Sequence, residues 1–400
     1  MGKPENPCAV VLGGHVNGYS IIQELADCGV KEIALVVYHK SSGMPQLATR
    51  SRYVNHVYRM QKSAESLRNI LETIHERHDL LVVYPTDDHQ LELLCQLAPE
   101  ISGFCFLPLN PEKTLKYQDK FEQYAACERF GVPYPKTVLL HGPGDLDSLR
   151  NLMWPVIVKP VTRQDITTRL FRLKIYDSMD ALLLDAEAFA AYFKQGQRFI
   201  ASEVIPGDGS TLYSHVAYLG QDGRIVNDWA GRKYSQRPDD FGVFATAGNI
   251  APAVVSDLGR KLTEGIGITG FTQTEFKYDH RDGQYKLMEI NQRPHMWNRM
   301  GHLTGVSLNL AHWQKALGLP VEKQEQNLTR DIRFTYLRHE LHNRIEYGRA
   351  YRDRQKRILR GGDRLVLAVY DKHDIKPFLS DLLSTGLSSA RLLLRKLTRR

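Results

Sequence analysis

Three short apolar runs near the start of the chain constrain its fold most. Residues 9–12, 33–37 and 80–84 read AVVL, IALVV and LLVVY, and continuous apolar runs of this length are typical of strands buried on both faces of a parallel sheet. Helix-like segments over 18–27 and 66–78 separate them. Strands that alternate with helices at this spacing predict a parallel βαβ domain, which we place at residues 1–112.

The pattern changes after this segment. A helix is predicted over 118–130, where Gly131 and Pro133 end it. Apolar and polar residues then alternate with the period of antiparallel strands, over 156–159, 171–175, 199–204, 212–219, 224–229, 272–278 and 284–291. We therefore expect an α+β body at 113–320, followed by a basic, mainly helical extension at 321–400 with one strand candidate at 365–370.

The charge of the chain is unevenly distributed. The net charge is +8, yet residues 321–400 hold 19 Lys and Arg against 10 Asp and Glu, and the first 320 residues hold 34 against 35. A protein built to bind nucleic acid usually carries basic residues across a folded face, with aromatic residues between them. The neutral body lacks this pattern, so we expect no nucleic-acid partner.

Three further features favour the cytoplasm. No apolar stretch approaches the roughly 18 residues that span a bilayer, and the first ten residues do not have the pattern of a secretory signal. The five cysteines, Cys8, Cys28, Cys95, Cys105 and Cys127, include no C-x-x-C pair. An odd number of cysteines among apolar residues is typical of reduced thiols in a cytoplasmic protein.

A predicted hairpin at 274–291 carries the strongest chemical signal. Pairing across the turn at 280–283 brings Glu275 close to Glu289, and Glu289 and Asn291 share one face of the second strand because side chains alternate along it. On the same reasoning Met288 and Ile290 face a core. Converging oxygen ligands beside Arg293 suit Mg²⁺ or Mn²⁺. The alternative is a solvated strand pair with scattered charges.

Two lysines and one turn give weaker signals. Lys159 ends the apolar run 154–158, where a buried ammonium group needs an anion. Lys120 stands at a predicted helix start, and taken alone it is interpreted as a surface lysine. The segment 202–209 reads SEVIPGDG, a strand that runs into a Pro/Gly turn, and taken alone it is unspecific.

The order of these pieces resembles the ATP-grasp superfamily from about residue 9 to residue 318. The matching pieces are Asp119-Lys120, WPVIVKP at 154–160, EVIPG at 203–207, Gly231-Arg232-Lys233, Thr274-Glu275-Phe276 and MEINQR at 288–293. Within the superfamily the chain is similar to carboxylate–amine ligases such as D-aspartate ligase and the large chain of carbamoyl-phosphate synthase. TRSRY at 49–53 and DIKPFL at 374–379 also look like that branch. The resemblance implies an ATP-grasp fold, α/β and α+β, behind a Rossmann-like N-terminal domain.

The resemblance also implies a role for each matched residue. Lys120 and Lys159 would contact the ATP phosphates, and Glu203, Val204 and Ile205 would hold adenine, largely through the backbone. Asp208 would reach the ribose. The remaining residues would serve the reaction itself. Glu275, Glu289 and Asn291 would bind Mg²⁺ or Mn²⁺, and Arg293 would steady the phosphate during its transfer. Arg232 and Lys233 would face the phosphate or the substrate carboxylate.

Some positions depart from the family or stay open. The branch often carries Arg where this chain has Ser235 and Pro where it has Gln292, and the first departure puts the binding of the substrate carboxylate in doubt. His295 and Trp297 follow the metal motif. They could line the acceptor site, or they could serve packing and capping only.

The implied function is an ATP-dependent ligase that activates a carboxylate as an acyl phosphate and joins it to an amine. The alternatives are biotin-carboxylase-like carboxylation and a non-catalytic ATP-binding scaffold. The expected partners are a small carboxylate and a small amine, a cell-envelope precursor being one candidate. The sequence leaves the particular substrates, the pathway and the oligomeric state open, a homodimer included.

The last residues, 388–400, place leucines on one helical face with basic residues beside it. Such a helix can lie on an anionic membrane as a weak, salt-sensitive peripheral contact. In the alternative structural interpretation, the leucines pack on the body and the charges face water. Nucleic-acid binding by the basic tail is a third interpretation.

Overall fold

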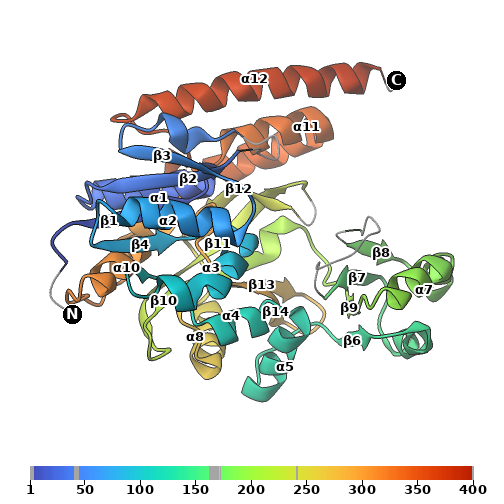
Figure 1. Cartoon of the computed structure of the whole chain (residues 1–400). Coiled ribbons are helices and arrows are strands. Elements are labelled where there is room, and N and C mark those ends of the chain that lie inside the picture. Colours follow the sequence, from blue (N-terminus) through green and yellow to red (C-terminus); the bar gives the residue numbers. More distant parts are fainter. Residues whose placement is uncertain (1–3, 40–44, 162–170, 172, 240–241, 399–400) are drawn as a thin grey trace.

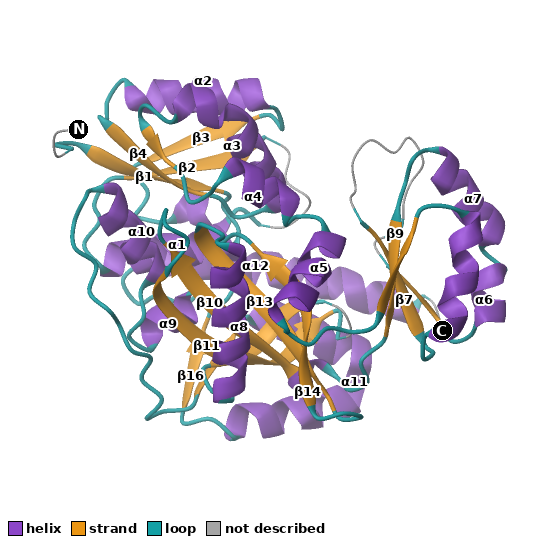
Figure 2. Cartoon of the chain, turned by 90° about the horizontal axis from the view of Figure 1, so that it is seen from below, coloured by secondary structure: helices purple, strands orange, loops and turns teal. Residues whose placement is uncertain are grey.

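The computed structural model describes residues 4–39, 45–161, 171, 173–239 and 242–398, and three sheets organise this part of the chain (Figures 1 and 2). The first is a five-stranded parallel sheet in the order β3-β2-β1-β4-β5. Its strands are β1 (Pro7–Leu12), β2 (Ile33–Tyr38), β3 (His56–Met60), β4 (Leu80–Tyr84) and β5 (Cys105–Phe106). The parallel βαβ pattern predicted for this region is confirmed.

Helices cover both faces of this sheet, which explains why its strands are apolar without interruption. Ala9 and Val11 of β1 pack in a cluster with α1 (Val16–Asp27), whereas Val10 and Leu12 pack with α2 (Ala64–His75) and α3 (Asp88–Ile101). Helix α3 begins at a capping box, in which Asp87 accepts from the backbone of Gln90 and the Gln90 side chain accepts in return.

The second sheet is antiparallel and small, in the order β6-β9-β7-β8. It comprises β6 (Thr137–Leu140), β7 (Val156–Pro160), β8 (Lys174–Tyr176) and β9 (Phe199–Glu203), with α6 (Met179–Leu183) and α7 (Ala186–Lys194) packed against it. The strand predicted at 171–175 falls partly outside the described residues, and β8 begins only at Lys174. This sheet stands apart from the rest of the molecule as a separate lobe (Figure 2).

The third sheet has the order β14-β13-β10-β11-β12-β15-β16. Its strands are β10 (Leu212–Leu219), β11 (Ile225–Arg237), β12 (Val243–Gly248), β13 (Gly270–Asp279), β14 (Gln284–Asn291), β15 (Ile332–Thr335) and β16 (Arg364–Leu367). The helices that accompany it are α4 (Pro111–Lys116), α5 (Lys120–Phe130), α8 (Ala253–Ile266), α9 (Arg299–Leu303) and α10 (Leu308–Ala316). Strand β11 runs on to Arg237, past the predicted end at 229, and β12 and β15 were not predicted because they are short and lack clear alternation.

The C-terminal segment belongs to this third sheet as well as covering it. Strand β15 pairs antiparallel with β12 and parallel with β16, so residues after 320 extend the sheet at its edge. The two long helices of the segment are α11 (Leu337–Arg360) and α12 (Ile375–Leu397), which lie beside each other along one side of the molecule (Figure 1). The domain boundaries at 112 and 320 stay predictions.

The orientation of helix α12 contradicts the interpretation in which its last leucines pack on the body of the protein. After Pro377 the buried positions of α12 are polar, namely Asp381, Thr385 and Ser389, while Leu394 and Leu397 are 62% and 69% exposed. The idea that the last leucines pack on the body is therefore wrong. Among the described residues, no helix combines the length and the apolar character that crossing a membrane requires. All five cysteines are free, and all but Cys28 are buried.

Candidate active site

A cavity of about 1130 Å³ lies where the small antiparallel lobe faces β13 and β14. Side chains from the N-terminal domain, among them Asp88 and His89, close it on another side. Eleven of the twelve residues predicted from the sequence line this cavity: Lys120, Lys159, Glu203, Val204, Ile205, Asp208, Lys233, Glu275, Glu289, Asn291 and Arg293. They come from the second and third sheets, from the segments that follow β9 and β14, and from the first residue of α5. The fold thus brings together positions up to 173 residues apart, from Lys120 to Arg293.

The hairpin of β13 and β14 pairs the two carboxylates directly. Glu275 and Glu289 are register partners, and Gln273 stands opposite Asn291. A β-bulge follows at Glu275/Phe276, after which Phe276 pairs with Leu287. The bulge corrects one detail of the prediction: Met288 is half-buried and lines the cavity, and the core side of β14 is formed by Leu287 and Ile290.

Three lysines converge on this hairpin. Lys233, on β11, forms an ion pair with Glu275 Oε2. Burial alone would raise the pKa of Glu289, but the charges of Lys120, Lys159 and Lys233 outweigh it and lower the pKa. Glu289 is therefore ionised at neutral pH, and the cavity holds a compact group of opposite charges suited to a polyanion and a cation together.

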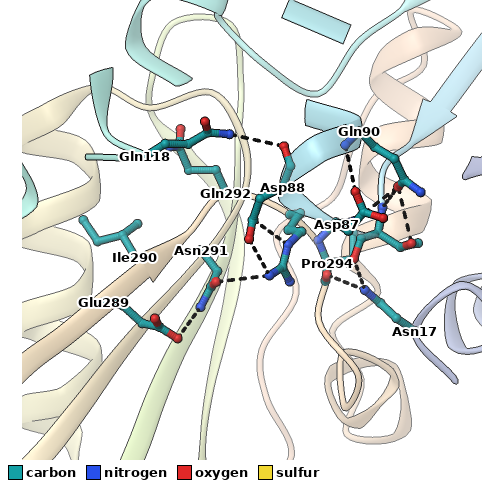
Figure 3. Close-up of polar contacts among 12 residues, drawn as sticks. Asn17, Asp87, Asp88, Gln90, Gln118, Glu289, Ile290, Asn291, Gln292 and Pro294 are labelled. Atoms are coloured by element: carbon teal, nitrogen blue, oxygen red, sulfur yellow. Dashed lines mark hydrogen bonds and ion pairs between the residues drawn. The ribbon is translucent and has the colours of Figure 1, made fainter. Parts of the chain in front are cut away.

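A chain of hydrogen bonds ties the hairpin to the N-terminal domain (Figure 3). Asn291 Nδ2 donates to Glu289 Oε1 at 3.2 Å, and Arg293 Nη2 donates to Asn291 Oδ1 at 3.4 Å. Arg293 also holds Asp88, at the first turn of α3, through Nε at 2.7 Å and Nη2 at 3.2 Å. The guanidinium group is thus fixed by a bidentate pair, which orients it more firmly than one contact could.

Gln123 of α5 supports the hairpin from its open edge. Its Oε1 accepts from Ile290 N at 2.8 Å, and its Nε2 donates to Ile290 O at 3.1 Å and to Tyr117 O at 2.8 Å. Ile290 lies between Glu289 and Asn291, so this amide fixes the backbone that carries both ligands. Gln123 could not be recognised from the sequence, because its partner on β14 is 167 residues away along the chain.

The hinge segment after β9 is held by a second residue that the sequence did not indicate. Lys277 Nζ, buried on β13, donates to Ile205 O and Gly207 O, both at 2.7 Å. Glu203 accepts from Met153 N at 2.9 Å through Oε1. Asp208 caps a short turn by accepting from Ser210 N at 2.9 Å and also faces Arg354 of α11 at 3.4 Å. Hydrogen bonds therefore hold the segment at both ends.

Arg232 is the predicted residue that does not line the cavity. Side chains alternate along β11, so Arg232 and its neighbour Lys233 leave the strand on opposite faces. Arg232 Nε donates to Ser210 O at 2.7 Å, and its guanidinium group lies over the rings of Tyr213 and Tyr234. This placement does not support a contact between Arg232 and a phosphate or a substrate carboxylate.

His295 and Trp297 form a buried wall at the other end of the cavity. The His295 ring stacks near Trp229 and packs edge-on against Trp297, and among the described residues neither ring nitrogen has a hydrogen-bond partner. Burial, together with the charges of Lys233 and Arg293, lowers the pKa of His295 well below its usual range. A neutral imidazole with two unpartnered nitrogens is suited to a polar ligand group.

The residues present fit a hard divalent cation. Among the described residues no three His, Cys, Asp or Glu side chains gather around one point. Glu275, Glu289 and Asn291 offer two carboxylates and one amide, and Mg²⁺ is commonly held by one or two carboxylates together with substrate phosphates. Glu275 already forms an ion pair with Lys233, so a bound cation would share this carboxylate with the ammonium group.

The fold matches that of several solved enzymes. The chain superposes on biotin carboxylase from Campylobacter jejuni with a TM-score of 0.61 (14% identity, 80% of this chain and 73% of that chain). It matches the ADP complex of N5-carboxyaminoimidazole ribonucleotide synthetase with a TM-score of 0.59 and 15% identity, over 83% of this chain and 82% of that chain. It matches L-amino acid ligase from Bacillus licheniformis with a TM-score of 0.56 and 16% identity, over 79% of this chain and 75% of that chain. The chain has the ATP-grasp fold, as predicted from the motifs.

Sequence comparison adds one curated relative, and no family model matches the chain. The chain is similar to D-aspartate ligase from Enterococcus faecium, with 26% identity over 261 residues. The match covers 60% of this chain, and the chain spans 60% of the length of that relative.

Proposed function

We propose that the protein is an ATP-dependent ligase that activates a carboxylate as an acyl phosphate and joins it to an amine, with release of ADP and phosphate. One observation carries the proposal: Lys120, Lys159 and Lys233 converge on the paired carboxylates Glu275 and Glu289 within one cavity. The similarity to D-aspartate ligase and the fold shared with L-amino acid ligase support it.

In the first step a carboxylate oxygen of the substrate attacks the γ-phosphorus of ATP, and the bond from that phosphorus to the bridging oxygen of ADP breaks. Negative charge is spread over the phosphoryl oxygens in the transition state, so fixed cations lower the barrier. Lys120, Lys159 and Arg293 supply them. A bound Mg²⁺, held by Glu275, Glu289 and Asn291, would add charge neutralisation at the phosphates.

In the second step the nitrogen of the amine attacks the acyl carbon. The carbon–oxygen bond to phosphate breaks, phosphate leaves with the electron pair, and the nitrogen loses one proton. Because water hydrolyses acyl phosphates, the acceptor end of the site has to be dry. His295 and Trp297 are buried there and could orient the acceptor while they exclude solvent.

The runner-up is ATP-dependent carboxylation with bicarbonate, since biotin carboxylase is among the structural neighbours. It differs in one requirement, because its ATP turnover depends on bicarbonate instead of an amino acid. A non-catalytic ATP-binding scaffold is a weaker alternative, since a scaffold has no need for Glu275, Glu289 and Asn291 beside three lysines.

The test is a trapping assay with ATP, MgCl₂, hydroxylamine and a panel of amino acids. An acyl phosphate reacts with hydroxylamine to give a hydroxamate, so the expected result is hydroxamate and ADP that both depend on one carboxylate. Glu289→Gln is expected to form neither, while Gln284→Ala, at the exposed start of β14, retains both. ADP release that needs only bicarbonate, without hydroxamate from any carboxylate, would favour carboxylation.

Several finer points remain part of this proposal. The acceptor is proposed to be a small amine, with a cell-envelope precursor as one candidate, and a homodimer is compatible with the chain. A cytoplasmic location is proposed as well, and the five cysteines, which form no disulfide in this structure, are compatible with it. Peripheral membrane contact through residues 388–400 is supported by the exposed leucines of α12.

A further inference from the structure

The outer face of α12 is apolar from Leu379 to Leu397. Six leucines, Leu379, Leu383, Leu387, Leu393, Leu394 and Leu397, are each between 48% and 73% exposed. At 100° per residue they fall within about 120° of the helix circumference, so they form one continuous row on a helix about 35 Å long. Within the part of the chain that the structure describes, α12 is the outermost element on its side of the molecule (Figure 1).

The opposite face of α12 is polar and already engaged with α11 and its surroundings. Asp381 Oδ1 accepts from Tyr336 OH at 3.1 Å, and Ser384 Oγ accepts from Arg338 Nη1 at 2.9 Å. One turn further on, His342 Nε2 and Ser388 Oγ lie 2.9 Å apart. Turning the leucines inward would break these contacts and leave buried polar groups unpaired, so the outward orientation is the stable one.

A groove of about 500 Å³ continues this apolar face into the gap between α11 and α12. Leu341 and Ile345 of α11 and Leu393 and Leu397 of α12 line it, together with Arg344 and Arg352. An apolar floor with guanidinium groups beside it suits a ligand that has a hydrocarbon part and an anionic head.

The charge around the apolar row is of one sign. Residues 382–398 contain no acidic side chain, and Arg391 and Arg395 flank the leucines. Lys396 is turned toward α11, where its Nζ donates to Ile345 O at 2.7 Å and to Glu346 O at 3.0 Å. A second copy of the chain would meet this surface with the same charge. In a parallel pair the basic ends coincide, and in an antiparallel pair they meet the exposed Lys372 and Lys376. Neither arrangement offers an anionic partner.

We propose that the outer face of α12, together with the groove between α11 and α12, binds the surface of an anionic phospholipid bilayer. The helix lies flat, its leucines enter the boundary between head groups and acyl chains, and the basic residues meet the lipid phosphates. The surface extends from Leu379 to Leu397, well beyond residues 388–400. It lies outside the active-site cavity, so membrane binding and the ligase reaction can be measured separately.

The experiment is co-sedimentation of the full chain with phosphatidylcholine vesicles that contain either no or 40% phosphatidylglycerol. We expect binding to the anionic vesicles only, and a steep loss of binding between 50 and 500 mM NaCl because salt screens the charges. One basic residue near an anionic bilayer contributes about 1 kcal/mol, or about fivefold in partitioning. Arg391→Glu/Arg395→Glu is therefore expected to weaken binding at least about 25-fold.

A second variant tests the leucines, and matched controls test specificity. Leu383→Ser/Leu387→Ser/Leu394→Ser is expected to lose vesicle binding. Leu184→Ser, at a leucine that is 88% exposed on the small lobe, and Lys31→Glu/Lys194→Glu are expected to retain it. Circular dichroism checks that each variant is folded, and hydroxamate formation from soluble substrates is expected to stay unchanged in all of them.

Three outcomes would overturn the proposal. The full chain stays in the supernatant with anionic vesicles at low salt, or the leucine variant binds as well as the parent. In the third, light scattering finds a dimer that the leucine variant converts to a monomer, without vesicle binding by either form. That result would show that the exposed leucines of α12 form a contact between two copies of the chain. If the parent protein forms no hydroxamate, the result contradicts the proposed ligase function and has no bearing on the membrane contact.

Discussion

Ser51 Oγ donates a hydrogen bond of 2.5 Å to Asp374 Oδ2, across 323 residues of the chain. Asp374 stands immediately before α12 and also accepts from Tyr19 OH at 3.1 Å and from Arg52 N at 3.0 Å. The two sequence segments at 49–53 and 374–379 that resembled the ligase branch therefore meet in space. This contact joins the N-terminal domain to the start of α12.

We expect Asp374→Ala to destabilise the protein markedly. The substitution leaves the Ser51 hydroxyl group and the backbone N–H of Arg52 without their acceptor, while Tyr19 OH keeps only the backbone oxygen of residue 374, at 3.3 Å. Each buried unpaired group costs about 1–3 kcal/mol. Urea unfolding should therefore report a loss of about 3 kcal/mol in the free energy of unfolding. Asp353→Ala, which removes an exposed carboxylate from α11, should change it by less than about 0.5 kcal/mol. Equal stability of the two variants would refute the structural role of Asp374.

Glu289→Gln and Asn291→Ala are expected to abolish ATP turnover while the protein remains folded. Both residues face the three lysines on the same side of β14, and neither is part of an apolar cluster. Phosphate release with ATP and Mg²⁺ measures turnover, and thermal unfolding measures folding. Normal phosphate release from Glu289→Gln would remove this residue from the metal site.

Lys159→Ala is expected to lose nucleotide affinity by at least about tenfold with little change in stability. The side chain reaches the cavity from the end of β7 and lies near enough to Glu289 to lower its pKa. Calorimetry with ADP and Mg²⁺ measures the affinity. Lys194→Ala, on the exposed face of α7 in the same lobe, is the control, and unchanged affinity in Lys159→Ala would exclude a phosphate contact. Lys120→Ala is expected to fold as the parent does.

Gln123→Met is expected to weaken metal-dependent turnover because it loosens the backbone of β14. The substitution keeps most of the volume but removes the amide that holds Ile290 on both sides, so Glu289 and Asn291 lose their fixed backbone. The Mg²⁺ concentration for half-maximal turnover should rise several-fold, and stability should fall by about 1–3 kcal/mol. If stability falls but the Mg²⁺ concentration for half-maximal turnover does not change, Gln123 stabilises the fold without positioning the metal ligands. Gln284→Met serves as the control.

The stability contributed by His302 is expected to depend on pH. Burial alone would lower the pKa of His302, but hydrogen bonds to Asp27 and Cys28 outweigh it and raise the pKa to about 10. The unfolded chain has a histidine pKa near 6.5. The contribution is therefore fully present below about pH 6.5 and is lost as pH rises toward 10.

Unfolding of the parent and His302→Gln in urea at pH 6, 8 and 10 tests this. The difference in their free energies of unfolding should shrink as the pH rises, and Asp27→Asn should lessen the same dependence. A difference that stays constant from pH 6 to pH 10 would contradict the raised pKa.

Much of the site could be predicted from the sequence because its residues sit in local patterns that fix their direction. The alternation of Glu289 and Asn291 follows from the strand itself, and the lysine that ends an apolar run is visible without a fold. Arg232 and Lys233 show the limit of that approach. The two are adjacent in sequence, and only the orientation of β11 decides that Lys233 reaches the cavity while Arg232 packs on Tyr213 and Tyr234.

The apolar runs of the first domain determined its parallel sheet, because only a strand covered on both faces tolerates so few polar residues. Contacts between distant segments could not be determined in this way. The hydrogen bonds between Gln123 and Ile290, between Lys277 and Ile205 and between Arg293 and Asp88 join residues that show no periodic pattern in the sequence. The amphipathic pattern of α12 was plain in the sequence, but the pattern does not state which face is buried. That was decided by Tyr336, Arg338 and His342, whose polar side chains are satisfied by the polar face of α12 and so leave its leucines exposed.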